Sequence, residues 1–137
     1  MDLDDLIVKK AGKSIPDLFA QDGEPYFRQL EARILRQTVE KYGENTAVLA
    51  LGGGAVMDSA SAALLHEKTV CIYLRASLDT LLQRLAGQTA GRPLADDSMA
   101  ARLAAREPIY EETAHVVIDT DGLSPDEVAD EIIISSL

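Results

Sequence analysis

The chain has 137 residues, with 23 acidic against 13 basic side chains and a formal net charge of −10. Such an acidic chain disfavours nucleic acid and anionic membranes as partners, because their phosphates repel it. No apolar run is long enough to cross a membrane, and the opening residues MDLDDL are acidic where a secretory signal would be basic. We therefore expect one soluble cytoplasmic domain over residues 1–137.

The beginning of the chain indicates two helices. Asp4 or Asp5 is expected to cap a helix of about residues 5–11 that ends at Gly12, and Ser14 is expected to cap a second one.

A long helix and three short apolar runs follow. Residues 23–43, GEPYFRQLEARILRQTVEKYG, place apolar side chains at helical spacing before a final glycine stop. The apolar runs are TAVLAL (46–51), TVCIYLRA (69–76) and HVVID (115–119). Because they are apolar on both faces, they predict strands of a parallel sheet that is covered on both sides.

Helical patterns separate these runs. They cover about residues 57–66, 77–86 and 98–112, and a last helix begins after the capping residue Ser124. Alternating strands and helices predict an α/β fold with right-handed connections and helices on both faces of the sheet. Cys71, the single cysteine, is expected to be a small buried apolar side chain.

Residues 86–98, AGQTAGRPLADDS, form a longer connection than usual and contain an isolated Arg92. Such a segment is either a lid over a site or a plain surface loop.

The letters AGKS at residues 11–14 raise the question of a nucleotide site. A phosphate-binding P-loop, G-x-x-x-x-G-K-[ST], needs a glycine five positions before Gly12, where this chain has Ile7. We therefore expect a helix junction there and no phosphate loop.

A glycine turn follows the first apolar run. The segment LGGGAV (51–56) lets a ligand approach the backbone of Gly52, Gly53 and Gly54 closely, although it could be only a tight turn. It is no dinucleotide fingerprint, because Met57 breaks the G-x-G-x-x-G spacing.

Several charged residues could carry chemistry. Asp2 and Asp4 would point the same way in an extended segment and could hold hydrated Mg²⁺ or a hydroxyl, but they could also be a helix-capping cluster. An ion pair on a solvated helix face is enough to explain Arg28 and Glu31. Arg106, in AAREPIYEE, could be a surface residue.

In this order the pieces closely resemble shikimate kinase. The resemblance runs from Asp2 to the C-terminus and rests on F-R-x-x-E, LGGGAV, GRPL, R-x-P-x-Y and DTDGLSPDEV. It implies a P-loop kinase fold that uses ATP and Mg²⁺ to phosphorylate the 3-hydroxyl of shikimate. A related kinase, such as gluconate kinase, is a weaker match.

The resemblance assigns roles on the shikimate side. Asp4 corresponds to the acid that holds the reacting hydroxyl and acts as base, and Asp2 to the one that reaches Mg²⁺ through water. Arg28 and Arg106 correspond to the arginines that bind the shikimate carboxylate, a task for a planar bidentate donor. The glycines 52–54 correspond to the turn that lines the pocket.

It also assigns roles on the nucleotide side. Arg92 corresponds to the lid arginine that stabilises transferred phosphate charge. Arg84 and the turn around Pro125 fall where the family contacts adenine. The lid departs from the family's R-P-L-L, because Ala95 stands at the second leucine.

The resemblance starts at the acids that end the family's second strand, so the first strand, the P-loop, the first helix and most of the second strand have no counterpart. The first of these strands is central in the family's sheet. We therefore expect about three remaining strands, little or no kinase activity, and either a fragment of a longer protein or a homo-oligomer or complex with a strand-supplying partner. The alternative is a non-catalytic shikimate-binding or strand-pairing protein.

Overall fold

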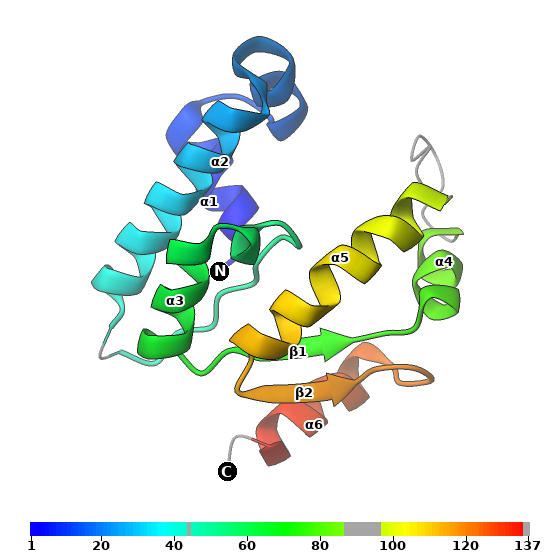
Figure 1. Ribbon diagram of the computed structural model, residues 1–137. Coiled ribbons are helices and arrows are strands. Elements are labelled where there is room, and N and C mark those ends of the chain that lie inside the picture. The colour runs from blue at the N-terminus through cyan, green and yellow to red at the C-terminus, as the bar shows by residue number, and fades with distance from the viewer. Residues whose placement is uncertain (44, 87–96, 136–137) are drawn as a thin grey trace. The chain divides into compact units, whose positions relative to one another are not determined.

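The structure is a computed structural model that describes residues 1–43, 45–86 and 97–135 (Figure 1). It divides into two compact units, residues 1–69 and 70–137. In chain order the elements are α1 (Leu3–Ala11), α2 (Ile15–Lys41), the 3₁₀ helix η1 (Ala55–Met57), α3 (Ser59–Lys68), β1 (Ile72–Arg75), α4 (Leu78–Ala86), α5 (Asp97–Thr113), β2 (Val116–Asp119) and α6 (Pro125–Ser135). The single domain expected over the whole chain stays a prediction.

In the first unit, α1 begins earlier than expected. Asp2, and not Asp4 or Asp5, is its N-cap, because the Asp2 carboxylate accepts the Asp4 backbone N–H at 2.8 Å. The helix ends at Gly12, which takes φ 73° as a left-handed C-cap, as the sequence predicts. α1 packs against α2 (Figure 1) around four fully buried side chains: Leu3, Ile7, Leu18 and Leu35.

α2 joins the two helices that the sequence predicts as separate. Its cap is Ser14, whose hydroxyl accepts the Asp17 backbone N–H at 3.2 Å. The two parts meet at Gly23, where φ 83° and ψ 163° leave the helical region, and Pro25 follows. This backbone suits glycine, which has no Cβ to clash at positive φ, so the helix bends there instead of stopping.

The strand expected over residues 46–51 is wrong. The run makes an isolated bridge between Ala50 and Asp2: the Ala50 N–H donates to the Met1 carbonyl at 2.8 Å, and the Ala50 carbonyl accepts the Leu3 N–H at 2.9 Å. The Met1 ammonium also donates to the Val48 carbonyl at 2.8 Å. The ladder cannot extend, because α1 begins at Leu3 and removes the next backbone groups. Val48 is left 80% exposed.

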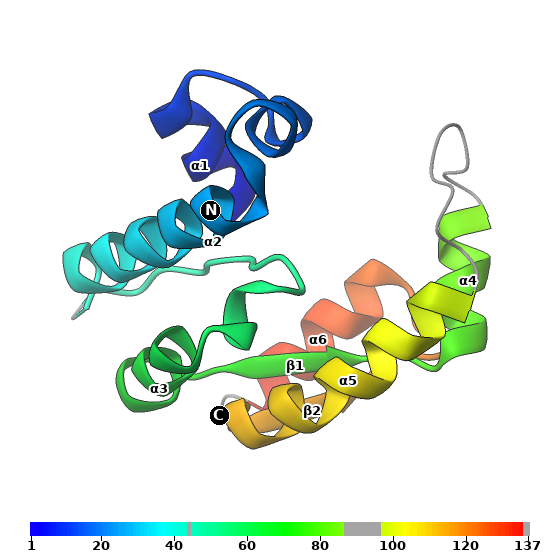
Figure 2. The same cartoon turned by 45° about the horizontal axis from the view of Figure 1, so that its top comes forward.

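In the second unit, β1 and β2 pair in parallel with Ile72 opposite Val116 and Arg75 opposite Asp119. The described residues therefore contain two strands where about three were expected, and both are shorter than the apolar runs that predicted them. The α/β class and the parallel direction are confirmed. Figures 1 and 2 show α5 and α6 on opposite sides of this small sheet.

The remaining helices lie where their patterns predict. Ser124 caps α6 as expected: its hydroxyl accepts the Glu127 N–H at 3.2 Å, and the Glu127 carboxylate accepts the Ser124 N–H at 3.1 Å. Cys71 is half-buried, not fully buried as predicted, and burial raises the pKa of its thiol. Within the described ranges, no helix is long and apolar enough to cross a membrane.

Candidate functional site

The Gly12–Ser14 segment is a helix junction. Gly12 closes α1 and Ser14 caps α2, while the Lys13 ammonium contacts the Asp22 carboxylate at 2.5 Å and the Gln21 side-chain oxygen at 3.1 Å. These groups are committed to local contacts. The helix junction that the sequence predicts here is confirmed, and these residues do not form a cradle of backbone N–H groups around a phosphate.

Asp4 lies against the glycine turn of the same unit. A Cβ built on Gly52 would lie 3.6 Å from one carboxylate oxygen of Asp4 and 3.9 Å from the other. The turn itself is tight, because the Ala55 N–H donates to the Gly52 carbonyl at 3.3 Å. The structure thus brings together one predicted catalytic acid and the predicted pocket glycines.

The environment of Asp4 raises the pKa of its carboxyl. Partial burial is the largest cause, and the negative charges of Asp2 and Asp5 add to it, while the Arg28 guanidinium acts in the opposite direction. A carboxylate with a raised pKa is a better proton acceptor than an exposed one. The position therefore suits a group that accepts a hydrogen bond, or a proton, from a hydroxyl.

Arg28 is held by acidic side chains of α2. Its Nη1 donates to Glu31 Oε1 at 2.9 Å, and its Nε lies 3.6 Å from Glu24 Oε1. The predicted i,i+3 pair exists, but its placement on a solvated face is wrong, because the Glu31 side chain is only 5% exposed. The buried Glu31 carboxylate therefore fixes the orientation of the Arg28 guanidinium.

The Arg28 guanidinium also lies directly against Gly54. A Cβ built on Gly54 would lie 2.4 Å from Arg28 Nη1 and 2.7 Å from Cζ. Gly54 has φ −94° and ψ −6°, which any residue can adopt. Glycine suits this position because a side chain would collide with the Arg28 guanidinium, and not because the backbone needs glycine's conformational freedom. This contact was not foreseen from the sequence, where only the run of three glycines hinted at a close approach.

Asp2 has a local structural role. Its carboxylate caps α1, so the expectation that Asp2 and Asp4 project together from an extended segment is wrong: helix α1 begins between them. In the described part of the chain, no group of three or more His, Cys, Asp or Glu side chains could hold a metal ion. A contact of Asp2 with Mg²⁺ stays a prediction.

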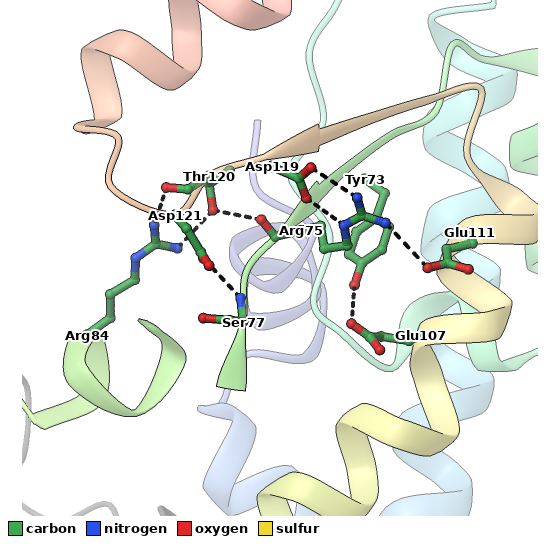
Figure 3. Close-up of polar contacts among 9 residues, drawn as sticks. All are labelled: Tyr73, Arg75, Ser77, Arg84, Glu107, Glu111, Asp119, Thr120 and Asp121. Atoms are coloured by element: carbon green, nitrogen blue, oxygen red, sulfur yellow. Dashed lines mark hydrogen bonds and ion pairs between the residues drawn. The ribbon is translucent and has the colours of Figure 1, made fainter. Parts of the chain in front are cut away.

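In the second unit, Arg84 reaches the loop that leads to Pro125. Its guanidinium donates to Thr120 Oγ1 at 3.2 Å and to the Thr120 carbonyl at 3.0 Å (Figure 3). Pro125 begins α6, five residues further along. The structure therefore brings Arg84 to the segment that carries the other residue assigned to the adenine side.

A network of polar contacts fastens α5 to the sheet (Figure 3). Arg75 donates to both oxygens of Asp119, at 2.6 and 3.0 Å, and lies 3.5 Å from Glu111 of α5. Tyr73 packs against Tyr110 with ring centroids 5.1 Å apart. Bonding to Arg75 lowers the pKa of the Asp119 carboxyl. No local pattern indicates this cross-strand pair, because its two members are 44 residues apart in the sequence.

The last two predicted site residues are Arg106, in α5, and Arg92, in the expected lid. Arg106 lies half-buried on α5, and no hydrogen bond or ion pair joins its side chain to the residues that the structure describes. Arg92, with residues 87–96 of the expected lid, lies outside the described residues.

Comparison with known proteins gives one family. The family model described as shikimate kinase matches residues 1–136. The chain is 42% identical over 134 residues to the shikimate kinase of Salinibacter ruber, covering 88% of this chain but 64% of that protein. It is 38% identical over 138 residues to that of Enterococcus faecalis, covering 97% of this chain and 80% of that protein.

Solved structures agree. The shikimate kinase from Acinetobacter baumannii in complex with shikimate matches 98% of this chain and 78% of its own, with a TM-score of 0.85 at 28% identity. The match to the shikimate kinase from Aquifex aeolicus covers 99% of this chain and 78% of that one, with a TM-score of 0.82 at 28% identity. The chain is thus similar to these kinases throughout its length but spans only part of theirs.

Proposed function

Because the chain belongs to the shikimate kinase family, we propose that it carries the shikimate-binding part of an enzyme that phosphorylates the 3-hydroxyl of shikimate with ATP. One observation supports this most directly: Asp4, Arg28 and the glycine turn 52–54 lie together in one compact unit, with a carboxylate of raised pKa and a guanidinium held along one edge. The Acinetobacter protein, similar over 98% of this chain, binds shikimate.

Each group has a task that its chemistry fits. Arg28, whose orientation Glu31 fixes, binds the substrate carboxylate, and the family resemblance gives Arg106 the role of a second donor. Asp4 accepts the hydrogen bond of the reacting hydroxyl and takes its proton as the oxygen becomes a nucleophile. Within the first unit, the Arg28 donor and the Asp4 acceptor would fix the substrate at its carboxylate and at its reacting hydroxyl.

The described residues include some that the family resemblance assigns to the nucleotide, but no phosphate-binding loop. ATP with Mg²⁺ supplies the phosphoryl group, and P-loop amides, a lysine and a hydroxyl normally hold its phosphates. The described residues do not fit that task, since Gly12, Lys13 and Ser14 are committed to the helix junction. Roles for Asp2, Arg84, Arg92 and Pro125 toward Mg²⁺ or the nucleotide are therefore proposals that depend on a phosphate loop from elsewhere.

Calorimetry with shikimate alone tests the substrate side. Arg28→Lys and Arg106→Ala should each weaken binding by about tenfold or more, because a bidentate charged contact is lost. Matched controls are Arg33→Lys on α2 and Arg102→Ala on α5, both exposed arginines of the same helices, which should leave binding unchanged. Equal effects of site and control variants would contradict the proposal.

A coupled ATP assay tests the reaction. The 137-residue chain should show little or no turnover, while a chimera that carries the N-terminal segment of the Enterococcus relative should phosphorylate shikimate. Turnover by the chain alone at a normal kinase rate would refute the argument that it needs a phosphate loop. Shikimate binding without turnover by either protein would favour the second candidate, a non-catalytic shikimate-binding protein, which the engagement of Lys13 and Ser14 in local contacts supports.

A further inference from the structure

Helix α5 is held against strand β1 by side-chain contacts. The Tyr73 ring packs on the Tyr110 ring with centroids 5.1 Å apart, and the Tyr73 hydroxyl lies 3.5 Å from Glu107 Oε1 (Figure 3). Further along the strand, Arg75 Nη1 lies 3.5 Å from Glu111 Oε1. These contacts fasten the C-terminal half of α5 to the sheet.

The Tyr73 hydroxyl is the donor in its contact with Glu107. Burial, followed by the negative charge of Glu107, raises the pKa of Tyr73 to about 12. The phenol therefore keeps its proton near neutral pH, and the Glu107 carboxylate accepts from it. Ring packing and this hydrogen bond act on two neighbouring positions of the same helix.

Arg106 lies in a turn of α5 that Pro108 weakens. Because Pro108 has no N–H, the Ala104 carbonyl lacks the helical hydrogen bond that residue 108 would otherwise donate. Arg106 lies between these two residues and one turn before Tyr110, which places it and Tyr110 on the same side of the helix. The contacts of Tyr73 therefore stabilise from outside the stretch of helix that its own backbone holds less firmly.

We propose that Tyr73 is a positioning residue for Arg106. Its two contacts fix the rotation of α5 about its axis, and with it the direction in which the Arg106 side chain leaves the helix. A group that binds a ligand must be held within about 0.5 Å and 10–20° of its working position. The effect on binding rests on the proposed function, which gives Arg106 the shikimate carboxylate, whereas the fastening of α5 by Tyr73 does not.

Calorimetry with shikimate on the 137-residue chain tests the effect on binding. Tyr73→Leu removes the ring packing and the hydroxyl, and should weaken binding about fivefold or more. Tyr73→Phe keeps the ring packing and should stay within about twofold of wild type. In the Arg106→Ala background, Tyr73→Leu should have no further effect, because the group that it positions is gone.

Two further measurements separate positioning from a general loss of stability. Val128→Ala removes a half-buried apolar contact on α6, the helix that packs against β2, and should lower the thermal midpoint without weakening shikimate binding. In hydrogen exchange, the α5 amides from residue 106 to residue 112 should exchange at least about fivefold faster in Tyr73→Leu than in wild type. The amides of α6 should exchange at the wild-type rate in the same variant.

Three results would overturn the proposal: unchanged exchange in α5, equal weakening of binding by Tyr73→Leu and Val128→Ala, or the full further loss when Tyr73→Leu is added to Arg106→Ala. Wild-type binding by Tyr73→Leu, with weakened binding by Arg106→Ala, would refute the positioning role alone and keep the proposed function. Wild-type binding by Arg106→Ala would refute the role that the proposed function gives Arg106, and the positioning role with it.

Discussion

Gly54→Ala should abolish most shikimate binding without unfolding the chain. The new Cβ would lie 2.4 Å from Arg28 Nη1, so the guanidinium must retreat by about 1 Å to reach ordinary contact. A hydrogen bond does not survive a shift of that size, and one to a charged group contributes about 1.5–3 kcal/mol. The dissociation constant for shikimate should therefore rise by about 10- to 150-fold.

The fold should tolerate this change. The displaced group is the end of a long, flexible side chain, and Gly54 has helical φ and ψ angles that alanine adopts readily. The thermal midpoint should therefore change little.

Calorimetry of four proteins tests this reasoning: wild type, Gly54→Ala, Arg28→Ala and the double variant. If Gly54→Ala acts through Arg28, it should have no further effect once Arg28 is alanine. Gly52→Ala is a milder control, because its Cβ meets Asp4 at an ordinary 3.6 Å and leaves Arg28 in place. Additive effects in the double variant, or wild-type binding by Gly54→Ala, would refute the reasoning.

Three further predictions concern charged groups. Glu31→Ala should destabilise the chain by about 1–3 kcal/mol in urea unfolding, because it removes a buried acceptor from Arg28; an unchanged midpoint would contradict this. The raised pKa of Asp4 stabilises the fold below the ordinary carboxyl value of 3.8, and that stability is lost as pH rises through the folded-state pKa. Asp4→Asn should thus raise the thermal midpoint near neutral pH but not at pH values below 3.8, and the opposite pattern would count against a raised pKa. The lowered pKa of the Asp119 carboxyl stabilises the fold at pH values above 3.8, and this stabilisation is lost as the pH falls through the folded-state pKa. In Arg75→Gln, NMR titration of the carboxyl should find the pKa of Asp119 closer to 3.8. An unchanged pKa would show that the pair with Arg75 is not its cause.

Helices could be predicted well from the sequence, and strands only in part. The helices have local signals: Ser14 and Ser124 as caps, Gly12 as a stop, and apolar side chains at helical spacing. The run at residues 46–51 has an equally clear apolar signal but forms no strand. A strand is stabilised by neighbours that lie far away in the sequence, and among the described residues this run makes an isolated bridge to Asp2 and no ladder.

The candidate site shows the same division. The types and spacing of Asp4, Arg28 and the three glycines are enough to suggest a carboxylate-binding, hydroxyl-orienting site, through the resemblance that they carry. That Glu31 is buried, and that Gly54 provides room for the guanidinium, could not be predicted, because burial and interatomic distance depend on how α2 and the glycine turn pack.

The sequence by itself determined the family, the chemical character of the substrate-side residues and the absence of a P-loop at residues 11–14, because these depend on residue identity and order. The tertiary structure decided which groups meet. It joined Arg28 to Glu31 and Gly54, made Asp2 the N-cap of α1, and paired Arg75 with Asp119 across β1 and β2. These outcomes depend on packing and on backbone pairing between distant segments, which no local pattern encodes.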